Sequence, residues 1–413
     1  MTQPHDGARS PRADFRVSDP QYLADPYPYY HRLRSESPLC WVDGVRPEDG
    51  GWWLTRYEEI TIAGKNWERF GRGPGRAPTG PSPAMPEAVR ELFYFGALQM
   101  LNLEPPDHSR LRGLVSKAFT PRMVAQLRPT VESVTTGLID RMVEQGEADL
   151  IHDLAYPLPV MVIAALLGFP IADSDRLRDL SRTAAKLFDA SRTQADLVNA
   201  ARAMAELVQM MREIMARRRA EPRDDLISGL IQASEEEHRA TEDEIVANAV
   251  LLLLAGHETT TNLIGNGLYA LLQNPDQWSL LRSESDLIEN AVEELLRFDS
   301  PVQGAVRMVL QEAEIAGMTF KAGERVWLMY GAANRDPAIF PDPDRLDLRR
   351  PNASRHLSFG QGIHFCLGAP LARLEGQIAI REMVRRAPDL TLRAAERSGF
   401  ATLRGFKRLD VTL

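Results

Sequence analysis

One cysteine in this 413-residue chain stands where it could do chemistry. Cys366 follows Gly360 and Gly362 in the segment FGQGIHFCLG and opens a predicted helix. The free N–H groups and the dipole at a helix N-terminus stabilise a thiolate. A lone thiolate with such donors suits one strong axial metal bond. Two other interpretations stay open for these residues, a buried structural cysteine in a glycine-rich turn and a zinc ligand pair with His364.

A second motif, AGHETT over residues 255–260, interrupts the most apolar part of the chain. Gly256 costs about 1 kcal/mol relative to alanine inside a helix, which suggests that the missing side chain has a use. Thr259 can donate a hydrogen bond to the Ala255 carbonyl and open the helix locally. Taken alone, the motif also fits a kinked core helix.

Long helical patterns must position these motifs. They cover residues 122–144, 196–219, 241–273, 286–298 and about 366–386, and Thr241 with Glu244 predicts a capping box at the start of the third. Short strand signals occur at 52–54, 306–310, 325–328 and 409–413. Since strands and helices do not alternate, we expect a mainly α fold with a minor β region. Residues 71–86, nine of which are Gly or Pro, predict an irregular loop. The apolar cluster after it, residues 92–95, suits a lid that buries a ligand, or else an ordinary core-packing helix behind a mobile surface loop.

Composition narrows the function classes. Hydrophobic residues make up 44% and charged residues 26%, which is typical of a globular protein. The net charge of −8 argues against nucleic-acid and anionic-membrane binding. Two cysteines leave no disulfide framework. The most apolar run, residues 245–255, is shorter than the roughly 20 residues of a bilayer span, so we expect no membrane anchor and a cytoplasmic location.

The spacing of residues 359–368 resembles the haem-binding loop of the cytochrome P-450 superfamily, and the resemblance extends from about Pro26 to the C-terminus. It implies the triangular cytochrome P-450 fold, with a flexible segment over 1–25 and a single haem-thiolate domain over 26–413. Cys366 would be the axial ligand of haem b (iron protoporphyrin IX). Phe359, Gly360 and Gly368 would belong to the loop that binds the cofactor.

The resemblance assigns roles to the other motifs. Residues 255–260 look like an oxygen-binding groove, in which Ala255 and Gly256 leave room, Thr259 positions dioxygen and water, and Glu258 relays protons. The positions that bind haem propionates are matched by His108, Arg112, Arg307 and His364. Glu294 and Arg297 match a buried structural ion pair, with Arg345 as the candidate third member.

By family position, an apolar substrate pocket is expected. Its predicted lining is Phe93, Phe95, Val250, Leu251, Leu254, Val302, Ala305, Phe400, Ala401 and Thr402. The small residues at 304 and 305 suggest a roomy site, with a macrolide, steroid or terpenoid as candidate substrates.

The implied activity is an O2-dependent monooxygenase that hydroxylates or epoxidises an apolar small molecule. Its two electrons would come from a ferredoxin or flavodoxin with an NAD(P)H-dependent reductase. Two alternatives stay open. One is an H2O2-dependent fatty-acid peroxygenase, against which the Glu258–Thr259 pair argues, and the other is a non-catalytic haem carrier or sensor.

Overall fold

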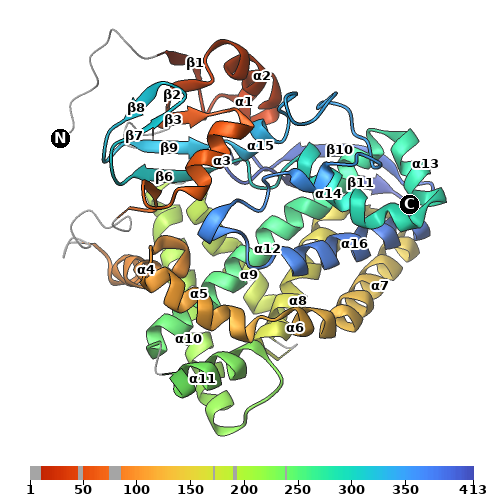
Figure 1. The fold of residues 1–413 in the computed structure, drawn as a ribbon. Helices are drawn as coiled ribbons and strands as arrows, with labels where there is room; N and C mark the ends of the chain where they lie inside the picture. Colours follow the sequence, from red (N-terminus) through yellow and green to blue (C-terminus); the bar gives the residue numbers. More distant parts are fainter. Residues whose placement is uncertain (1–10, 45–49, 74–84, 171–172, 189–192, 238–239) are drawn as a thin grey trace.

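The computed structural model describes residues 11–44, 50–73, 85–170, 173–188, 193–237 and 240–413. Its helices are α1 (Pro20–Ala24), α2 (Tyr27–Glu36), α3 (Tyr57–Lys65), α4 (Glu87–Ala97), α5 (Asp107–Ala118), α6 (Pro121–Gln126), α7 (Arg128–Gln145), α8 (Pro157–Leu167), α9 (Ser174–Ala185), α10 (Gln194–Ala220), α11 (Leu226–Glu237), α12 (Glu242–Leu272), α13 (Pro275–Ser283), α14 (Ile288–Phe298), α15 (Tyr330–Ala333) and α16 (Ala369–Arg386). Figure 1 shows these helices forming most of the molecule, with a smaller sheet region to one side. The expected mainly α fold with a minor β region is confirmed.

The strands form three sheets. They are β1 (Arg12–Arg16), β2 (Leu39–Asp43), β3 (Gly51–Leu54), β4 (Phe70–Gly71), β5 (Glu147–Asp149), β6 (Ala305–Val309), β7 (Ala313–Ile315), β8 (Met318–Phe320), β9 (Arg325–Leu328), β10 (Thr391–Arg397) and β11 (Phe406–Thr412). The six-stranded sheet has the order β1-β2-β3-β9-β6-β4, the three-stranded sheet β10-β11-β5, and the two-stranded sheet β7-β8. Antiparallel pairing of β6 with β9 sets Arg307 opposite Val326 and so fixes the place of one predicted site residue.

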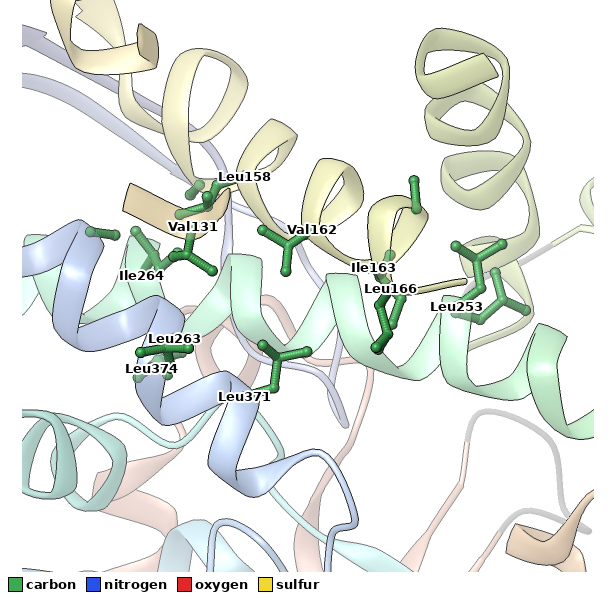
Figure 2. Packing of buried hydrophobic residues seen from close by; sticks show 14 of the residues in the cluster. Val131, Leu158, Val162, Ile163, Leu166, Leu253, Leu263, Ile264, Leu371 and Leu374 are labelled. Atoms are coloured by element: carbon green, nitrogen blue, oxygen red, sulfur yellow. The ribbon is translucent and has the colours of Figure 1, made fainter. Parts of the chain in front are cut away.

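Helix α12 lies at the centre of the helical part of the molecule. Its 31 residues begin with the predicted capping box, in which the Thr241 hydroxyl and the Glu244 carboxylate each accept a backbone N–H bond from the other. Figure 2 shows α12 packed between α8 and α16, through leucines and isoleucines such as Leu253, Leu263, Ile163 and Leu371. Since this contact buries apolar faces on both sides, the hydrophobic effect sets the position of the motif at residues 255–260.

Two predicted boundaries differ from the structure. The helix predicted over 122–144 is divided into α6 and α7 at Leu127, because Pro129 in the first turn of α7 has no backbone N–H to donate to a carbonyl of α6. The segment predicted to be flexible, 1–25, contains β1 and α1, where Phe15 and Tyr22 pack against Trp53. Residues 1–10, and residues 74–84 of the predicted loop, lie outside the described part of the chain.

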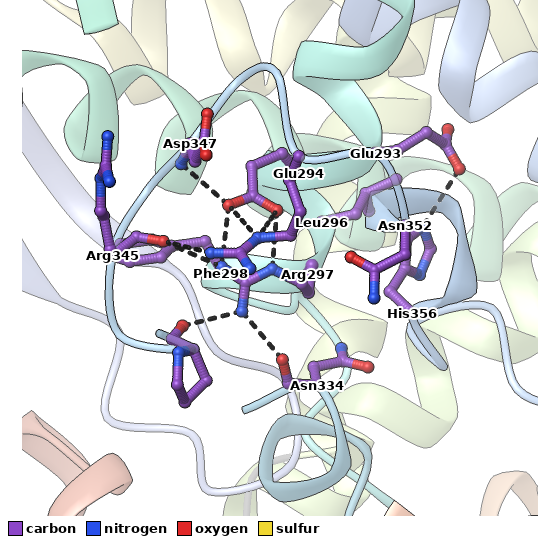
Figure 3. A network of polar contacts seen from close by, with 12 residues as sticks. Glu293, Glu294, Leu296, Arg297, Phe298, Asn334, Arg345, Asp347, Asn352 and His356 are labelled. Atoms are coloured by element: carbon purple, nitrogen blue, oxygen red, sulfur yellow. Dashed lines mark hydrogen bonds and ion pairs between the residues drawn. The ribbon is translucent and has the colours of Figure 1, made fainter. Parts of the chain in front are cut away.

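A buried ion-pair network fixes the segment that leads to the cysteine loop. The Arg297 guanidinium donates two hydrogen bonds to the Glu294 carboxylate, at 2.6 and 2.8 Å, and both side chains are fully buried. Its remaining donors reach the backbone carbonyls of Asn334, Pro343 and Arg345, as Figure 3 shows. The buried Glu294 carboxylate holds the Arg297 guanidinium, which in turn orders loop segments that lie far from α14 in sequence.

The third member of this network is Arg350, which corrects the prediction of Arg345. Arg350 Nε lies 3.1 Å from both Glu294 carboxylate oxygens, and the arginine is 5% exposed. Arg345 contributes only its backbone carbonyl, while its side chain points away from the pair and is exposed. Both arginines lie in the same irregular segment, so spacing alone could not tell which of them turns inward.

We predict that Arg350→Ala lowers the free energy of unfolding by about 3 kcal/mol, because it removes one partner from a buried charge network. Arg345→Ala is the matched control and should change stability by less than about 0.5 kcal/mol, since its carbonyl remains. Urea unfolding of the two purified variants measures both values. Equal losses would show that Arg350 is not the third member.

Candidate functional site

The cysteine loop is closed by its own backbone. The Cys366 N–H donates to the Phe359 carbonyl at 2.9 Å. The N–H groups of Gly368 and Ala369, at the start of α16, donate to the Cys366 sulfur. Burial raises the pKa of the Cys366 thiol, whereas these N–H groups and the charge of Arg112 act to lower it. A sulfur held in this way favours the thiolate once a positive centre binds it, as a metal ion does.

The two early glycines of the loop are explained by backbone conformation and by close packing. Gly360 and Gly362 have φ values of 69° and 67°, in the region that favours glycine. A Cβ at Gly362 would lie 2.5 Å from the Gly64 carbonyl oxygen of α3. The close approach that requires glycine at 362 is therefore to the protein's own helix.

An arginine supports the loop from α16. The Arg373 guanidinium lies 4.6 Å from the centre of the Phe359 ring and donates to the Glu293 carboxylate at 2.6 and 2.8 Å. Burial acts to raise the pKa of Glu293, but the hydrogen bonds from Arg373 and His356 lower it to about 2. Glu293 thus stays ionised and ties α16 to α14 beneath the loop.

The four predicted propionate-binding residues come together around His364. The rings of His108 and His364 are 4.5 Å apart, and Arg112 donates to the Phe365 carbonyl at 2.7 Å. Burial lowers the pKa of His364 to about 2, with further lowering by nearby Arg72, Arg307, His108 and Arg112. Four separate chain segments therefore supply one cationic and imidazole cluster.

Arg72 is the member of this cluster that sequence reasoning missed. It lies just after β4, between Gly71 and Gly73, and its backbone N–H donates to Glu104. The available signal was an arginine flanked by glycines at the start of the irregular segment. That signal was missed because the whole segment was interpreted as an irregular loop.

Two buried nitrogens in the cluster lack partners among the described residues. His108 Nδ1 and His364 Nε2 make no hydrogen bond, and His108 and Arg307 are each 3% exposed. Buried polar atoms without partners cost free energy, so such a group of donors favours an anionic ligand. Two carboxylates on the edge of a flat cofactor, as in haem, fit this donor set.

The groove motif on α12 has the predicted hydrogen bond but not the predicted opening. Thr259 donates to the Ala255 carbonyl at 2.9 Å, and Thr260 donates to the Gly256 carbonyl at 2.8 Å. Helix α12 nevertheless continues unbroken from Glu242 to Leu272. Ala255 is exposed although it lies in the middle of a buried helix, so this face borders open space. A Cβ at Gly256 would meet Ile163 at an ordinary 3.6 Å, and packing against α8 does not require glycine.

Glu258 stands on the same turn, and its carboxyl is in a dry environment. Burial raises its pKa to about 7. The neighbouring His257 is fully buried, which lowers its pKa to about 4. An acid whose pKa lies near neutrality can both donate and accept a proton at physiological pH.

The predicted pocket residues divide into two groups on α12. Leu251 is 8% and Leu254 6% exposed, on or beside the face that carries Ala255. Val250 is 0% exposed and lies about 140° around the helix from Ala255, so it belongs to the core and not to the lining, which corrects the prediction.

Other predicted pocket residues are placed by loop pairing. Val302 forms a bridge with Leu403, and the Gln303 N–H donates to the Thr402 carbonyl at 2.9 Å. Residues 302–305 and 400–402 are thus brought together, with Ala305 and Phe400 half-buried and Ala401 packed against the aromatic cluster around Trp53. On α4, Phe93 is half-buried and Phe95 is 5% exposed.

Gly304 does not indicate a roomy site, contrary to the expectation. A Cβ there would lie 2.9 Å from the Leu328 carbonyl oxygen of β9. The glycine is explained by this close approach to a neighbouring strand.

Comparison with known proteins agrees with this arrangement. Residues 81–387 match the family model described as "Cytochrome P450". The relative named "Cytochrome P450 107B1", from Saccharopolyspora erythraea, is 40% identical over 407 residues, which are 96% of this chain and 97% of that protein. The "Vitamin D(3) 25-hydroxylase" of Pseudonocardia autotrophica is 41% identical over 404 residues, 95% of this chain and 94% of that protein.

A solved structure gives the same result. P450BioI, in complex with an acyl carrier protein that carries hexadec-9Z-enoic acid, superposes with a TM-score of 0.87 and 36% identity, over 95% of this chain and 99% of that one. Fold and relatives define the class, a haem-iron oxidoreductase. The chain belongs to the cytochrome P450 family and is a monooxygenase.

Among the described residues, no helix is both long and apolar enough to cross a membrane. In the same part of the chain, no group of three or more His, Cys, Asp or Glu side chains is arranged to hold a metal ion.

We predict that Arg307→Leu weakens haem binding about tenfold to a hundredfold, because a buried guanidinium opposite a carboxylate is worth a charge-assisted hydrogen bond. The rate of haem transfer from the holoprotein to a haem-scavenging protein measures the change. Lys321→Ala, which removes an exposed positive charge after β8, is the control. Equal transfer rates in wild type and Arg307→Leu would contradict a role of Arg307 at the propionates.

Proposed function

We propose that this chain uses haem b, held by Cys366, to insert one oxygen atom from O2 into an apolar organic small molecule by hydroxylation or epoxidation. A ferredoxin or flavodoxin with its NAD(P)H-dependent reductase supplies the two electrons. The observation that carries the proposal is the Cys366 sulfur, which accepts N–H bonds from Gly368 and Ala369 beside the histidine–arginine cluster.

Each part of the site has a distinct task toward the cofactor. When bound, thiolate-held haem supplies the electron density that favours O–O cleavage. Cys366 binds the iron, and its two N–H donors moderate the charge on sulfur. The propionates are bound by His108, Arg112, Arg307 and His364, whose unpartnered nitrogens and buried charges support this assignment.

Thr259 and Glu258 act on water and protons in the groove of α12. The Thr259 hydroxyl hydrogen is engaged by the Ala255 carbonyl, so its oxygen is left as an acceptor for a water molecule in the groove. Glu258 has a pKa of about 7 and can release a proton to that water and take up another. Thr259 and Glu258 together provide one route for proton transfer, at a defined place on α12.

The proposed substrate is a bulky apolar natural product such as a macrolide, steroid or terpenoid. Support comes from the half-buried Phe93 and from Leu251 and Leu254, which provide apolar surface near the groove. It also comes from the name of the vitamin D(3) hydroxylase relative. The fatty acid in the P450BioI complex makes a carrier-bound acyl chain the next candidate to screen.

The cofactor assignment is tested by spectroscopy. We expect the reduced holoprotein with carbon monoxide to absorb at the long wavelength of thiolate-ligated haem. Cys366→Ser should lose that band, whereas Cys40→Ser should keep it, because Cys40 is buried away from the loop in β2. A wild-type spectrum like that of a histidine-ligated globin would refute the proposal.

We predict that Thr259→Ala consumes reducing equivalents with product formation reduced at least about tenfold, since the acceptor for the groove water is lost. Thr259→Ser keeps the hydroxyl and should retain most of the coupling. Product and consumed NAD(P)H are measured together once a substrate has been found by its effect on the haem spectrum. Full coupling in Thr259→Ala, or equal turnover with H2O2 alone, would favour the peroxygenase instead.

A further inference from the structure

His257, beside the acidic residue of the groove, has a single possible arrangement of its ring protons when neutral. Its Nδ1 lies 3.0 Å from the Leu253 carbonyl oxygen, one turn earlier in α12. Because a carbonyl oxygen only accepts hydrogen bonds, Nδ1 must carry the hydrogen. The neutral ring therefore presents Nε2 as a bare acceptor.

That acceptor faces Glu258. Nε2 lies 3.9 Å from Glu258 Oε2 and has no hydrogen-bond partner among the described residues. The ring is 0% exposed and packs edge-on against Tyr156, with ring centres 5.7 Å apart. A small rotation of the Glu258 side chain, moving its carboxyl by about 1 Å, reaches hydrogen-bond distance.

We infer that His257 is a positioning residue for Glu258: a protonated Glu258 carboxyl donates to His257 Nε2, and the two side chains together store one proton beside the Thr259 groove. The inference rests on the proposed function and names what holds its proton-relay acid. The only bond that breaks and re-forms is the carboxyl O–H bond. The stored proton leaves Glu258 for a groove water, the pair is left as carboxylate and neutral imidazole, and a proton from solvent restores it.

The surroundings keep this proton on the carboxyl. Burial raises the pKa of Glu258 to about 7 and lowers that of His257 to about 4, so near neutrality the acid is the protonated partner. The charged groups around Tyr156, on the neighbouring α9, are Arg178, Asp179 and Arg182. Tyr156 donates its hydroxyl hydrogen to the Arg178 carbonyl at 2.9 Å, so that hydrogen is not available to His257 Nε2.

The sign of the pH dependence follows. The folded pKa of Glu258 lies above the ordinary value of 4.5, so the folded chain keeps a proton that an unfolded chain releases. As pH rises through about 7, this proton is lost, and proton delivery falls with it. A hydrogen bond to His257 stabilises the protonated form, so removing the acceptor must lower the midpoint.

The test is a pH titration of the Glu258 carboxyl band by infrared difference spectroscopy on the ferric holoprotein, with the band identified by its loss in Glu258→Gln. We expect His257→Phe, which keeps a ring against Tyr156, to lower the midpoint by about one pH unit and to shift the C=O band to higher frequency. His257→Gln offers an amide oxygen as acceptor and should restore most of both values. Thr260→Val removes another side-chain bond from the same turn and should leave both unchanged.

A midpoint that is unchanged or raised in His257→Phe would overturn the inference. If that variant does not bind haem, the wild type provides the same test: in the ¹⁵N-labelled ferrous carbonyl form, the His257 Nε2 resonance must move as Glu258 titrates, and a constant resonance would refute the pair. Coupling of electron use to product gives an independent readout. Its pH midpoint should move with the infrared midpoint, whereas general damage would lower coupling at every pH.

These outcomes are separable from those of the proposed function. A wild-type carbon monoxide spectrum without thiolate character refutes the monooxygenase site and leaves the infrared titration of the pair intact. A thiolate spectrum with an unmoved Glu258 midpoint in His257→Phe refutes the pair alone.

Discussion

A single sulfur atom is presented to a metal at a defined place when the loop that carries it is held by its surroundings, and much of the structure around Cys366 does this. The loop is closed by the backbone hydrogen bond from the Cys366 N–H to the Phe359 carbonyl, and the first N–H groups of α16 donate to the sulfur. Behind it, Glu293 binds Arg373 while Glu294 binds Arg297 and Arg350. Two adjacent carboxylates on α14 thus anchor α16 and the irregular segment before the loop. The buried charged groups here have the structural role of holding these segments in place.

The proposed function also requires a place for the charged edge of the cofactor. We assign it to residues from α5, β6, the cysteine loop and the segment after β4, which lie far apart in the sequence. Gathering cations and imidazoles in a buried region costs free energy unless an anion is present. Among the described residues, His108 Nδ1 and His364 Nε2 have no hydrogen-bond partner, so the cluster has polar atoms left for a ligand. Haem binding and the final stability of this region are therefore expected to be coupled.

Helix α12 combines a structural task with a proposed chemical one. Its apolar faces pack against α8 and α16, and this packing keeps residues 255–260 in a continuous helix. The extra hydrogen bonds of His257, Thr259 and Thr260 all go to carbonyls one turn earlier, which leaves acceptor atoms free on the side chains. Burial in the protein interior then raises the pKa of Glu258 to near neutrality without any nearby counter-charge. The ability of Glu258 to take up and release a proton near neutral pH thereby follows from its burial.

From the sequence, periodicity predicted the mainly α class and spacing predicted the capping box at Thr241, because each depends on residues within one element. The cysteine loop, the groove motif and the Glu294–Arg297 pair were identified through the resemblance to the cytochrome P-450 superfamily. Tertiary structure decided the rest. Whether Arg345 or Arg350 turns inward, why Gly304 and Gly362 are glycine, that Arg72 joins His364, and that Val250 faces the core all depend on contacts between segments far apart in sequence. The local sequence pattern determines which side chains lie on each face of a helix or strand, whereas long-range packing determines which residues those side chains contact.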